Sequence, residues 1–416
     1  MFYNCTNLSS IEVWFTSWTN AIGATNNWVY NVAANGTFYC PSDLDTTTKN
    51  SSRVPSDWTV EGNHLPVPEF LTFTTSSSGK VALSTIGTPN AISLSYKKND
   101  GEWTSYTKNS YITLASGDTV SFSGNNYLFS NGINNRYNFR MSGNITAAGN
   151  LQSLRNYRAD NPSGCYTYLF SGCTALTDAH DLILPATGLA KNCYLGMFYY
   201  CTSLTSAPQT LPATTLADHC YAYMFQGCSS LINAPQLPAT GLASDCYNGM
   251  FNNCKSLTAV PESLPATTLA DSCYYSMFQN CSSLINAPQL PATTLADNCY
   301  RGMFGSCTSL TSAPATLPAT TLANNCYGYM FQGCTALSTA PNISATAITP
   351  ENCCQYMFSG CTALASVSVA FTTWTNNTSY WLTRVASNGT FYCPVALDTT
   401  TRSTSKVPSS WTVVNI

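Results

Sequence analysis

The chain has 416 residues, which is enough for two or three domains and a sizeable core. Only 8% of them are charged and the net charge is −3, whereas 44% are apolar and the chain contains 25 Tyr and 18 Phe. This composition excludes a basic surface for nucleic acid or acidic lipid and excludes a disordered chain. We find no apolar stretch of about 18 residues to span a membrane and no signal-peptide pattern.

Residues 1–60 match residues 357–413 almost throughout, with a three-residue insertion in the first copy. We therefore expect residues 1–65 to be the end of a preceding repeat array with its β-rich cap, in a piece of a longer tandem protein. A short but genuine reading frame is the alternative. Either way an apolar repeat edge would be bare, which predicts self-association through it. The matched pairs are Met1/Met357, Cys5/Cys361, Phe15/Phe371, Trp18/Trp374, Trp28/Trp381, Cys40/Cys393, Asp45/Asp398 and Trp58/Trp411.

Residues 66–157 have no such internal match and instead alternate apolar and polar residues in short runs. Turn sequences at 99–101 and 116–118 separate some of these runs, which predicts a small antiparallel β-sandwich. We expect Trp103 and Tyr106 in its core; a sugar-binding platform is the alternative. The runs are Phe70–Phe73, Ala91–Tyr96, Tyr111–Leu114, Thr119–Phe122 and Tyr137–Met141.

Residues 158–365 repeat with a period of 26 to 28 residues. Each repeat carries one cysteine and a second eight positions later, which indicates a solenoid. The first cysteines are Cys165, Cys193, Cys220, Cys246, Cys273, Cys299, Cys326 and Cys353. The second cysteines are Cys173, Cys201, Cys228, Cys254, Cys281, Cys307, Cys334 and Cys361.

One repeat, residues 211–235, shows what each coil should contain. Leu216, Cys220 and Met224 follow a capping-like Thr at i, i+4 and i+8, and Gly227 comes where a left-handed residue ends a helix. This pattern predicts a helix of about three turns, followed by a short parallel strand before Pro235. The fold class is then an α/β leucine-rich-repeat solenoid of about eight coils, with the β-sandwich before it and a β-rich cap over residues 366–416.

The cysteines allow three interpretations. Metal binding needs clustered ligands, and a spacing of eight with only three His in the chain does not supply them. Disulfides between stacked coils are possible in an exported protein, and Cys353, Cys354, Cys40 and Cys393 are the places to look. We favour buried, unreactive thiols, with the second cysteines of the repeats, Cys173 to Cys361, as a structural ladder.

No pattern for catalysis or for a cofactor is present, and we predict none of either. His219 precedes Cys220, but neighbours in sequence on a helix point to different faces. We predict instead that a row of small, uncharged residues beside the strands faces a ligand. The row consists of Ser206, Asn233, Ala259, Asn286, Ser312 and Thr339.

The pattern M-F-x-x-C-x-S-L-x-x-A-P-x-L-P-A-T-x-L-A-x-x-C-Y, over Cys165–Leu364, resembles the BspA-like leucine-rich-repeat surface proteins of gut anaerobes or of their phages. The segment Trp381–Val413 looks like the one that closes such arrays. The resemblance implies a non-enzymatic binding or adhesion scaffold outside the cell, with a host or bacterial surface protein or glycan as partner. A phage tail or receptor-binding protein on the virion surface, and a purely architectural rod, are the alternatives.

Overall fold

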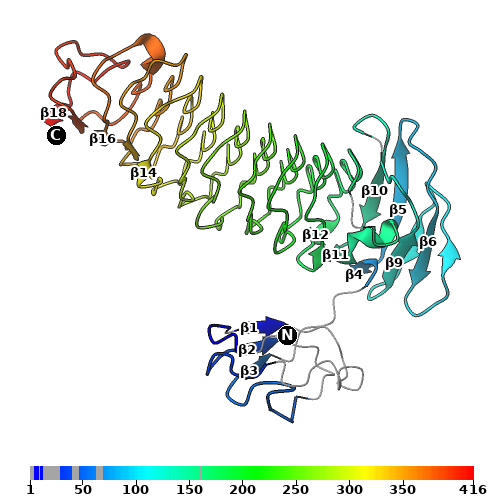
Figure 1. The fold of residues 1–416 in the computed structure, drawn as a ribbon. Coiled ribbons are helices and arrows are strands. Elements are labelled where there is room, and N and C mark those ends of the chain that lie inside the picture. The colour runs from blue at the N-terminus through cyan, green and yellow to red at the C-terminus, as the bar shows by residue number, and fades with distance from the viewer. Residues whose placement is uncertain are drawn as a thin grey trace. The chain divides into compact units, whose positions relative to one another are not determined.

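The computed structural model describes residues 4–8, 10–12, 29–39, 46–61, 69–130, 132–158 and 161–416. They form two compact units, Met1–Pro68 and Glu69–Ile416 (Figure 1). Six residues of the sequence match between the two ends lie outside the described residues: Met1, Phe15, Trp18, Trp28, Cys40 and Asp45.

The first unit contains a parallel sheet of three short strands, in the order β1-β2-β3. Ile11 of β1 and Phe38 of β2 form one buried apolar cluster with Val29, Val54 and Trp58. Self-association through an edge of this unit stays a prediction. The strands are β1 (Ser10–Glu12), β2 (Thr37–Tyr39) and β3 (Thr59–Glu61).

The C-terminal residues form a sheet of the same kind, parallel and in the order β16-β17-β18. Trp411 donates from Nε1 to the carbonyl oxygen of Ala386, and Trp58 donates in the same way to Ala33, both at 2.9 Å. The two copies of the matching sequence thus share strand order and an indole anchor. The strands are β16 (Ser366–Ser368), β17 (Thr390–Cys393) and β18 (Thr412–Asn415), with the 3-10 helix η3 (Asn376–Thr378) before β17.

The second unit begins with two sheets. One has the order β10-β5-β8, and the path through the other is β12-β11-β4-β9-β6-β7. Rings from both sheets meet, with Phe73 and Phe122 at 5.0 and 5.4 Å from Phe139. The strands are β4 (Leu71–Thr75), β5 (Gly79–Ile86), β6 (Leu94–Lys98), β7 (Thr104–Ser105), β8 (Ile112–Leu114), β9 (Thr119–Gly124), β10 (Arg136–Ser142) and β11 (Ile145–Asn150), followed by the 3-10 helix η2 (Leu151–Leu154).

The prediction that Trp103 lies in the core is wrong. Its side chain is 39% exposed and packs edge-on against Phe70, at 4.9 Å between ring centroids. Tyr106 is half-buried, and its hydroxyl accepts from the Leu83 amide at 2.7 Å and donates to the Ser110 carbonyl at 2.8 Å. A pattern of alternation places a side chain on one face of a strand, but Trp103 precedes the two-residue edge strand β7, where no sheet covers it.

The hairpin β10–β11 joins these sheets to the repeats. Strand β11 pairs in parallel with β12 (Leu176–Asp178) and β13 (Leu182–Ile183) of the first repeat. On the other side of the repeat, the Phe139 amide in β10 donates to the Leu169 carbonyl at 2.8 Å. The buried Asn138 amide group donates to three carbonyls of residues 168–171. The hairpin therefore takes the place of a coil before the first repeat.

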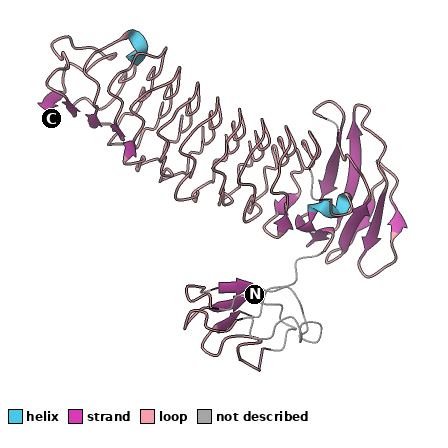
Figure 2. Ribbon diagram, viewed as in Figure 1, coloured by secondary structure: helices cyan, strands magenta, loops and turns pink. Residues whose placement is uncertain are grey.

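The repeats stack as coils, but the three-turn helix predicted in each is absent, so the α/β assignment is wrong. In the described part of the chain the helices are the short 3-10 turns η2 and η3, and the coils are drawn as loops (Figure 2). Strands within the array are short, and most of the pairing between neighbouring coils consists of isolated one-residue parallel bridges, such as Ser206–Asn233, Thr210–Gln236 and Thr215–Gly241. Two further strands of two residues each, β14 (Thr316–Leu317) and β15 (Asn342–Ile343), pair with each other in parallel.

The segment expected to be helical is a series of overlapping turns. The amide of Met224 bonds back to the Tyr221 carbonyl at 3.2 Å, whereas the next amide, of Phe225, reaches Met250 in the following coil at 2.9 Å. This alternation continues along the segment, with a left-handed residue at every fourth position, such as His219, Tyr223 and Gly227 (φ 55°, 57° and 75°). An α-helix would use all its interior amides internally, but here about half of them join coil to coil.

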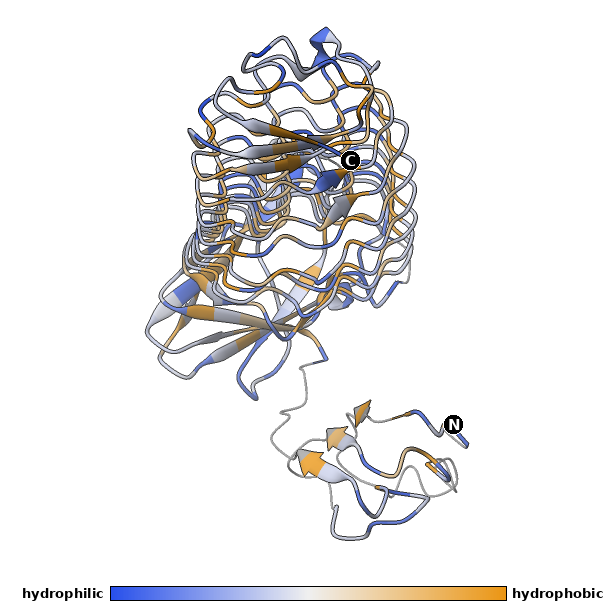
Figure 3. Cartoon of the chain, turned by 90° about the vertical axis from the view of Figure 1, so that its left-hand side faces the viewer, coloured by the Kyte–Doolittle hydropathy of each residue, from blue (hydrophilic) through white to orange (hydrophobic). Residues whose placement is uncertain are grey.

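Aromatic side chains in the interior form two files that run along the stack of coils. Figure 3 shows the backbone of this stack from its end. Neighbouring rings lie nearly parallel, at 5.2–5.7 Å between Phe centroids and 5.7–6.2 Å between Tyr centroids. The first file is Phe139, Phe170, Phe198, Phe225, Phe251, Phe278, Phe304, Phe331 and Phe358; the second is Tyr166, Tyr194, Tyr221, Tyr247, Tyr274, Tyr300 and Tyr327. One apolar core therefore runs through the whole second unit.

Candidate functional site

The residues predicted to face a ligand lie where neighbouring coils are bridged. Parallel bridges join Ser206 to Asn233, Asn233 to Ala259 and Asn286 to Ser312, and Thr339 pairs with Ser366 at the start of the cap. Ser206 is half-buried and the other five predicted residues are exposed. We call Ser206, Asn233, Ala259, Asn286, Ser312 and Thr339 the bridge row.

The residues just before the bridge row add apolar groups to the same surface. Ile232 and Ile285 are 46% and 49% exposed, and Thr205, Thr258 and Thr311 hold the equivalent positions in the other coils. The sequence analysis did not single out these two isoleucines, although the sequence Leu-Ile-Asn-Ala-Pro occurs twice and each copy contains one of them. The bridge row and its preceding residues, Thr205, Ile232, Thr258, Ile285, Thr311 and Ser338, form what we call the strand face, which carries no charge.

The second cysteines of the repeats are fully or almost fully buried, and each donates its thiol proton. The acceptor is the carbonyl oxygen of a Phe one coil earlier, or of Phe139 in β10 for the first repeat. The Sγ–O distances are 3.0–3.1 Å. The donors are Cys173, Cys201, Cys228, Cys254, Cys281, Cys307, Cys334 and Cys361.

Burial holds these thiols in the protonated form. It raises the pKa of Cys173 and of Cys361 to about 12 and that of Cys201 well above its usual value. Since the thiolate is the nucleophile and the metal ligand, such thiols are unreactive. Among the described cysteines none forms a disulfide, and the adjacent Cys353 and Cys354 are both buried and free.

The adjacent pair His219–Cys220 is not arranged for catalysis. The Cys220 side chain lies in the core, where burial raises its pKa well above the usual value. The His219 ring points instead to Asp245 in the next coil, at 3.5 Å from Nε2 to Oδ2. Within the described residues no three His, Cys, Asp or Glu side chains come together to hold a metal ion.

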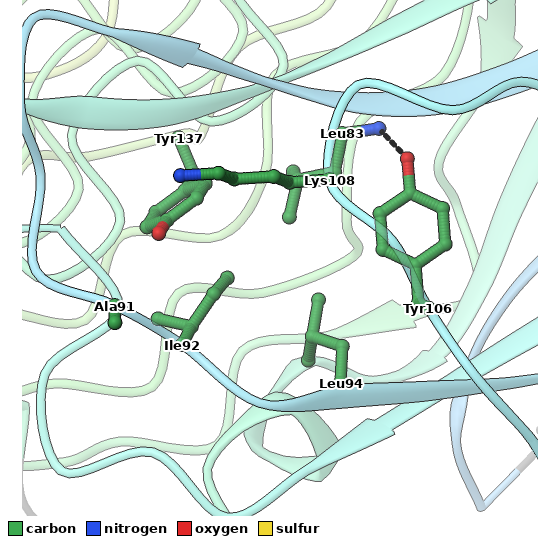
Figure 4. A pocket seen from close by; sticks show the side chains of 7 residues that line it. All are labelled: Leu83, Ala91, Ile92, Leu94, Tyr106, Lys108 and Tyr137. Carbon is green, nitrogen blue, oxygen red and sulfur yellow. Dashed lines mark hydrogen bonds between the residues drawn. The ribbon is translucent and has the colours of Figure 1, made fainter.

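A cavity of about 230 Å³ opens between the two sheets that precede the coils (Figure 4). Leu83 of β5, Leu94 of β6 and Tyr137 of β10 line it, and loop residues Ala91, Ile92, Tyr106 and Lys108 complete it. The Tyr137 hydroxyl donates to the Asn90 carbonyl at 2.7 Å. Burial raises the pKa of Tyr106 and of Tyr137, so both phenols stay neutral.

No helix among the described residues is long and apolar enough to cross a membrane.

Comparison with known proteins places the array within a known repeat type. The BspA-type leucine-rich repeat region matches in six copies over residues 160–285, 191–338 and 275–380. A leucine-rich repeat protein from Bacteroides ovatus, known from a crystal structure, is 18% identical, with 60% of this chain and 74% of that chain covered and a TM-score of 0.24. No curated protein matches the chain.

Proposed function

Because the chain belongs to the BspA-type leucine-rich repeat family, we propose that it is a non-catalytic scaffold that binds a protein partner at a cell surface. The matched repeats extend from residue 160 to residue 380, more than half of the chain. The strand face of these repeats is the binding site in this proposal.

The observation that carries the proposal is the composition of the strand face. The fully buried centre of a protein interface is depleted of charge and enriched in apolar groups, with a few side chains supplying most of the affinity. The strand face has no charge, two half-exposed isoleucines two coils apart, and hydroxyl and amide groups between them. Ile232 and Ile285 are the anchors in this proposal, and Asn233 and Asn286 are hydrogen-bonding groups.

Rigidity of the array supports the same role. Amide-to-carbonyl bonds between coils and the stacked Phe and Tyr files fix each coil against the next. A partner that binds such a surface loses less free energy to ordering of the scaffold, since little of it has to be ordered on binding. The proposed partner is a host or bacterial surface protein.

The experiment is a binding screen of the purified chain against immobilised mucins and extracellular-matrix proteins. We expect the double variant Asn233→Arg/Asn286→Arg to lose binding, because two bulky charges would be buried unpaired in the interface. The matched control is Thr267→Arg/Thr293→Arg, which adds the same charges at exposed positions outside the strand face. Equal binding by both variants would contradict the site, and loss of binding on deglycosylation of the target would assign a glycan as the partner.

A further inference from the structure

The cavity between the two sheets that precede the coils is a second candidate site, separate from the strand face. Its floor is apolar: Leu83 and Leu94 are buried, and Ile92 packs against the same core. The rings of Tyr106 and Tyr137 stand on either side of it in Figure 4. Such a floor favours a compact apolar group that is removed from water on binding.

The two phenol hydroxyls that line the cavity already make hydrogen bonds within the described part of the chain, whereas the Lys108 amine does not. The Tyr106 hydroxyl both accepts and donates a backbone hydrogen bond, and the Tyr137 hydroxyl donates one. Lys108 is exposed and makes no ion pair or hydrogen bond with the described residues. Figure 4 shows its amine at the rim beside Tyr137. A ligand in the cavity would therefore meet one free cation next to an apolar floor.

The charge of the surrounding segment points the same way. Residues 69–158 contain eight Lys and Arg but four Asp and Glu, a net charge of +4, although the whole chain has −3. The field around the cavity thus favours anions, whereas the strand face is neutral. This difference separates the chemistry of the two sites.

We propose that the cavity binds a small carboxylic acid whose body is a single ring or a branched alkyl group, with its carboxylate on the Lys108 ammonium. The volume of about 230 Å³ lies below the roughly 300–1,000 Å³ of pockets for drug-sized ligands, so the ligand is smaller than these. The apolar body lies against Leu83, Ile92 and Leu94. The proposal does not depend on the partner of the strand face.

The test is calorimetric titration of the whole chain with phenylacetate and with its neutral isostere phenylacetamide. We expect the acid to bind about tenfold more tightly, as a hydrogen bond to a charged group allows. Lys108→Met keeps the apolar stem and should remove the preference for the acid while weak binding of the amide remains. The control Lys80→Met removes an exposed charge of β5 that does not line the cavity, and it should keep the preference.

A second variant tests the place of the apolar body. Ala91→Trp fills the cavity from an exposed loop position and should abolish binding of both compounds. Methyl NMR of the wild-type chain should show acid-induced shifts at Ile92, Leu83 and Leu94. The proposal is overturned if the acid fails to bind up to its solubility limit or binds no better than the amide. Undiminished binding by Ala91→Trp, or an equal loss in both Met variants, also overturns it.

Discussion

The thiol of Cys228 donates a hydrogen bond of 3.1 Å to the carbonyl oxygen of Phe198 in the preceding coil. The same oxygen also accepts from the amide of Cys201 at 3.0 Å, so it has two donors. The cysteine thus combines a small apolar volume with a proton donor between coils. This relationship, repeated through the array, explains why these positions hold cysteine rather than alanine.

Substitution of Cys228 should separate the roles of donor and volume. We expect Cys228→Ala to lower the free energy of unfolding by about 1–3 kcal/mol, because it removes a buried group and a hydrogen bond. Cys228→Ser should cost less than Cys228→Ala, since it keeps a donor. Urea unfolding followed by fluorescence measures both.

Cys246 is the matched control, since it is equally buried but its sulfur is hydrogen-bonded by the backbone at Ala243 and Tyr247 and does not donate to a carbonyl of the preceding coil. Here Cys246→Ser should have no advantage over Cys246→Ala, because the native thiol donates no hydrogen bond between coils that serine could keep. The same order at both positions would contradict a role for thiol donation.

The free energy of unfolding should fall steeply above pH 9. Burial raises the pKa of Cys173, Cys246, Cys299 and Cys361 from 9.0 to about 12 and of Cys228 further still. Above pH 9 the unfolded chain releases these protons while the folded chain keeps them, so stability is complete below pH 9 and is lost as pH rises toward 12. In this range each such thiol lowers the free energy of unfolding by about 1.4 kcal/mol for every unit that the pH rises.

Urea midpoints measured from pH 7 to pH 11 test this linkage. The buried tyrosines, such as Tyr221 and Tyr247, add to the loss above pH 10, because burial raises their pKa as well. Constant stability up to pH 11 would mean that the thiols are not held in the interior.

The substitution Gly196→Ala distinguishes the turn structure from a helix, because the resulting change in stability has opposite signs in the two. The φ of Gly196 is 57°, and an added Cβ would clash with the Tyr168 ring. Gly196→Ala should therefore destabilise the protein by about 1–3 kcal/mol. In a helix the same change would stabilise by about 1 kcal/mol.

Gly188→Ala is its control, since Gly188 has no positive φ and its Cβ would meet open space. We expect a change within about 0.5 kcal/mol there. Thermal unfolding of the two variants measures both effects. A stabilising Gly196→Ala would contradict the left-handed turn at this position.

The repeat period and the burial of the cysteines follow from the sequence, but the helix does not. Leu216, Cys220 and Met224 are four apart, and this spacing suits a chain of overlapping turns as well as a helix of 3.6 residues per turn. The sequence predicted one part of the turn structure, a left-handed residue at Gly227. Tyr200 and Ser306 hold the same position in their repeats, and they are left-handed as well although neither is glycine.

Other features could not be predicted from one repeat, because they depend on contacts between coils. Tyr168 lies over Gly196 of the next coil, and the Phe198 carbonyl meets a thiol 30 residues later. Strand β5 was missed because its three consecutive apolar residues, Val81 to Leu83, do not alternate with polar ones. The joining role of the β10–β11 hairpin arises only when Asn138 reaches residues 168–171. The cavity at Lys108 needs residues from both sheets.

The most direct test of binding through the strand face is amide hydrogen exchange of the chain, alone and with the partner found in the screen. We predict that slowed exchange is confined to peptides that contain residues 205–206, 232–233, 258–259, 285–286, 311–312 and 338–339. Protection of the turn segments, such as residues 219–227, or of residues 69–158, with the strand face unchanged, would contradict the account.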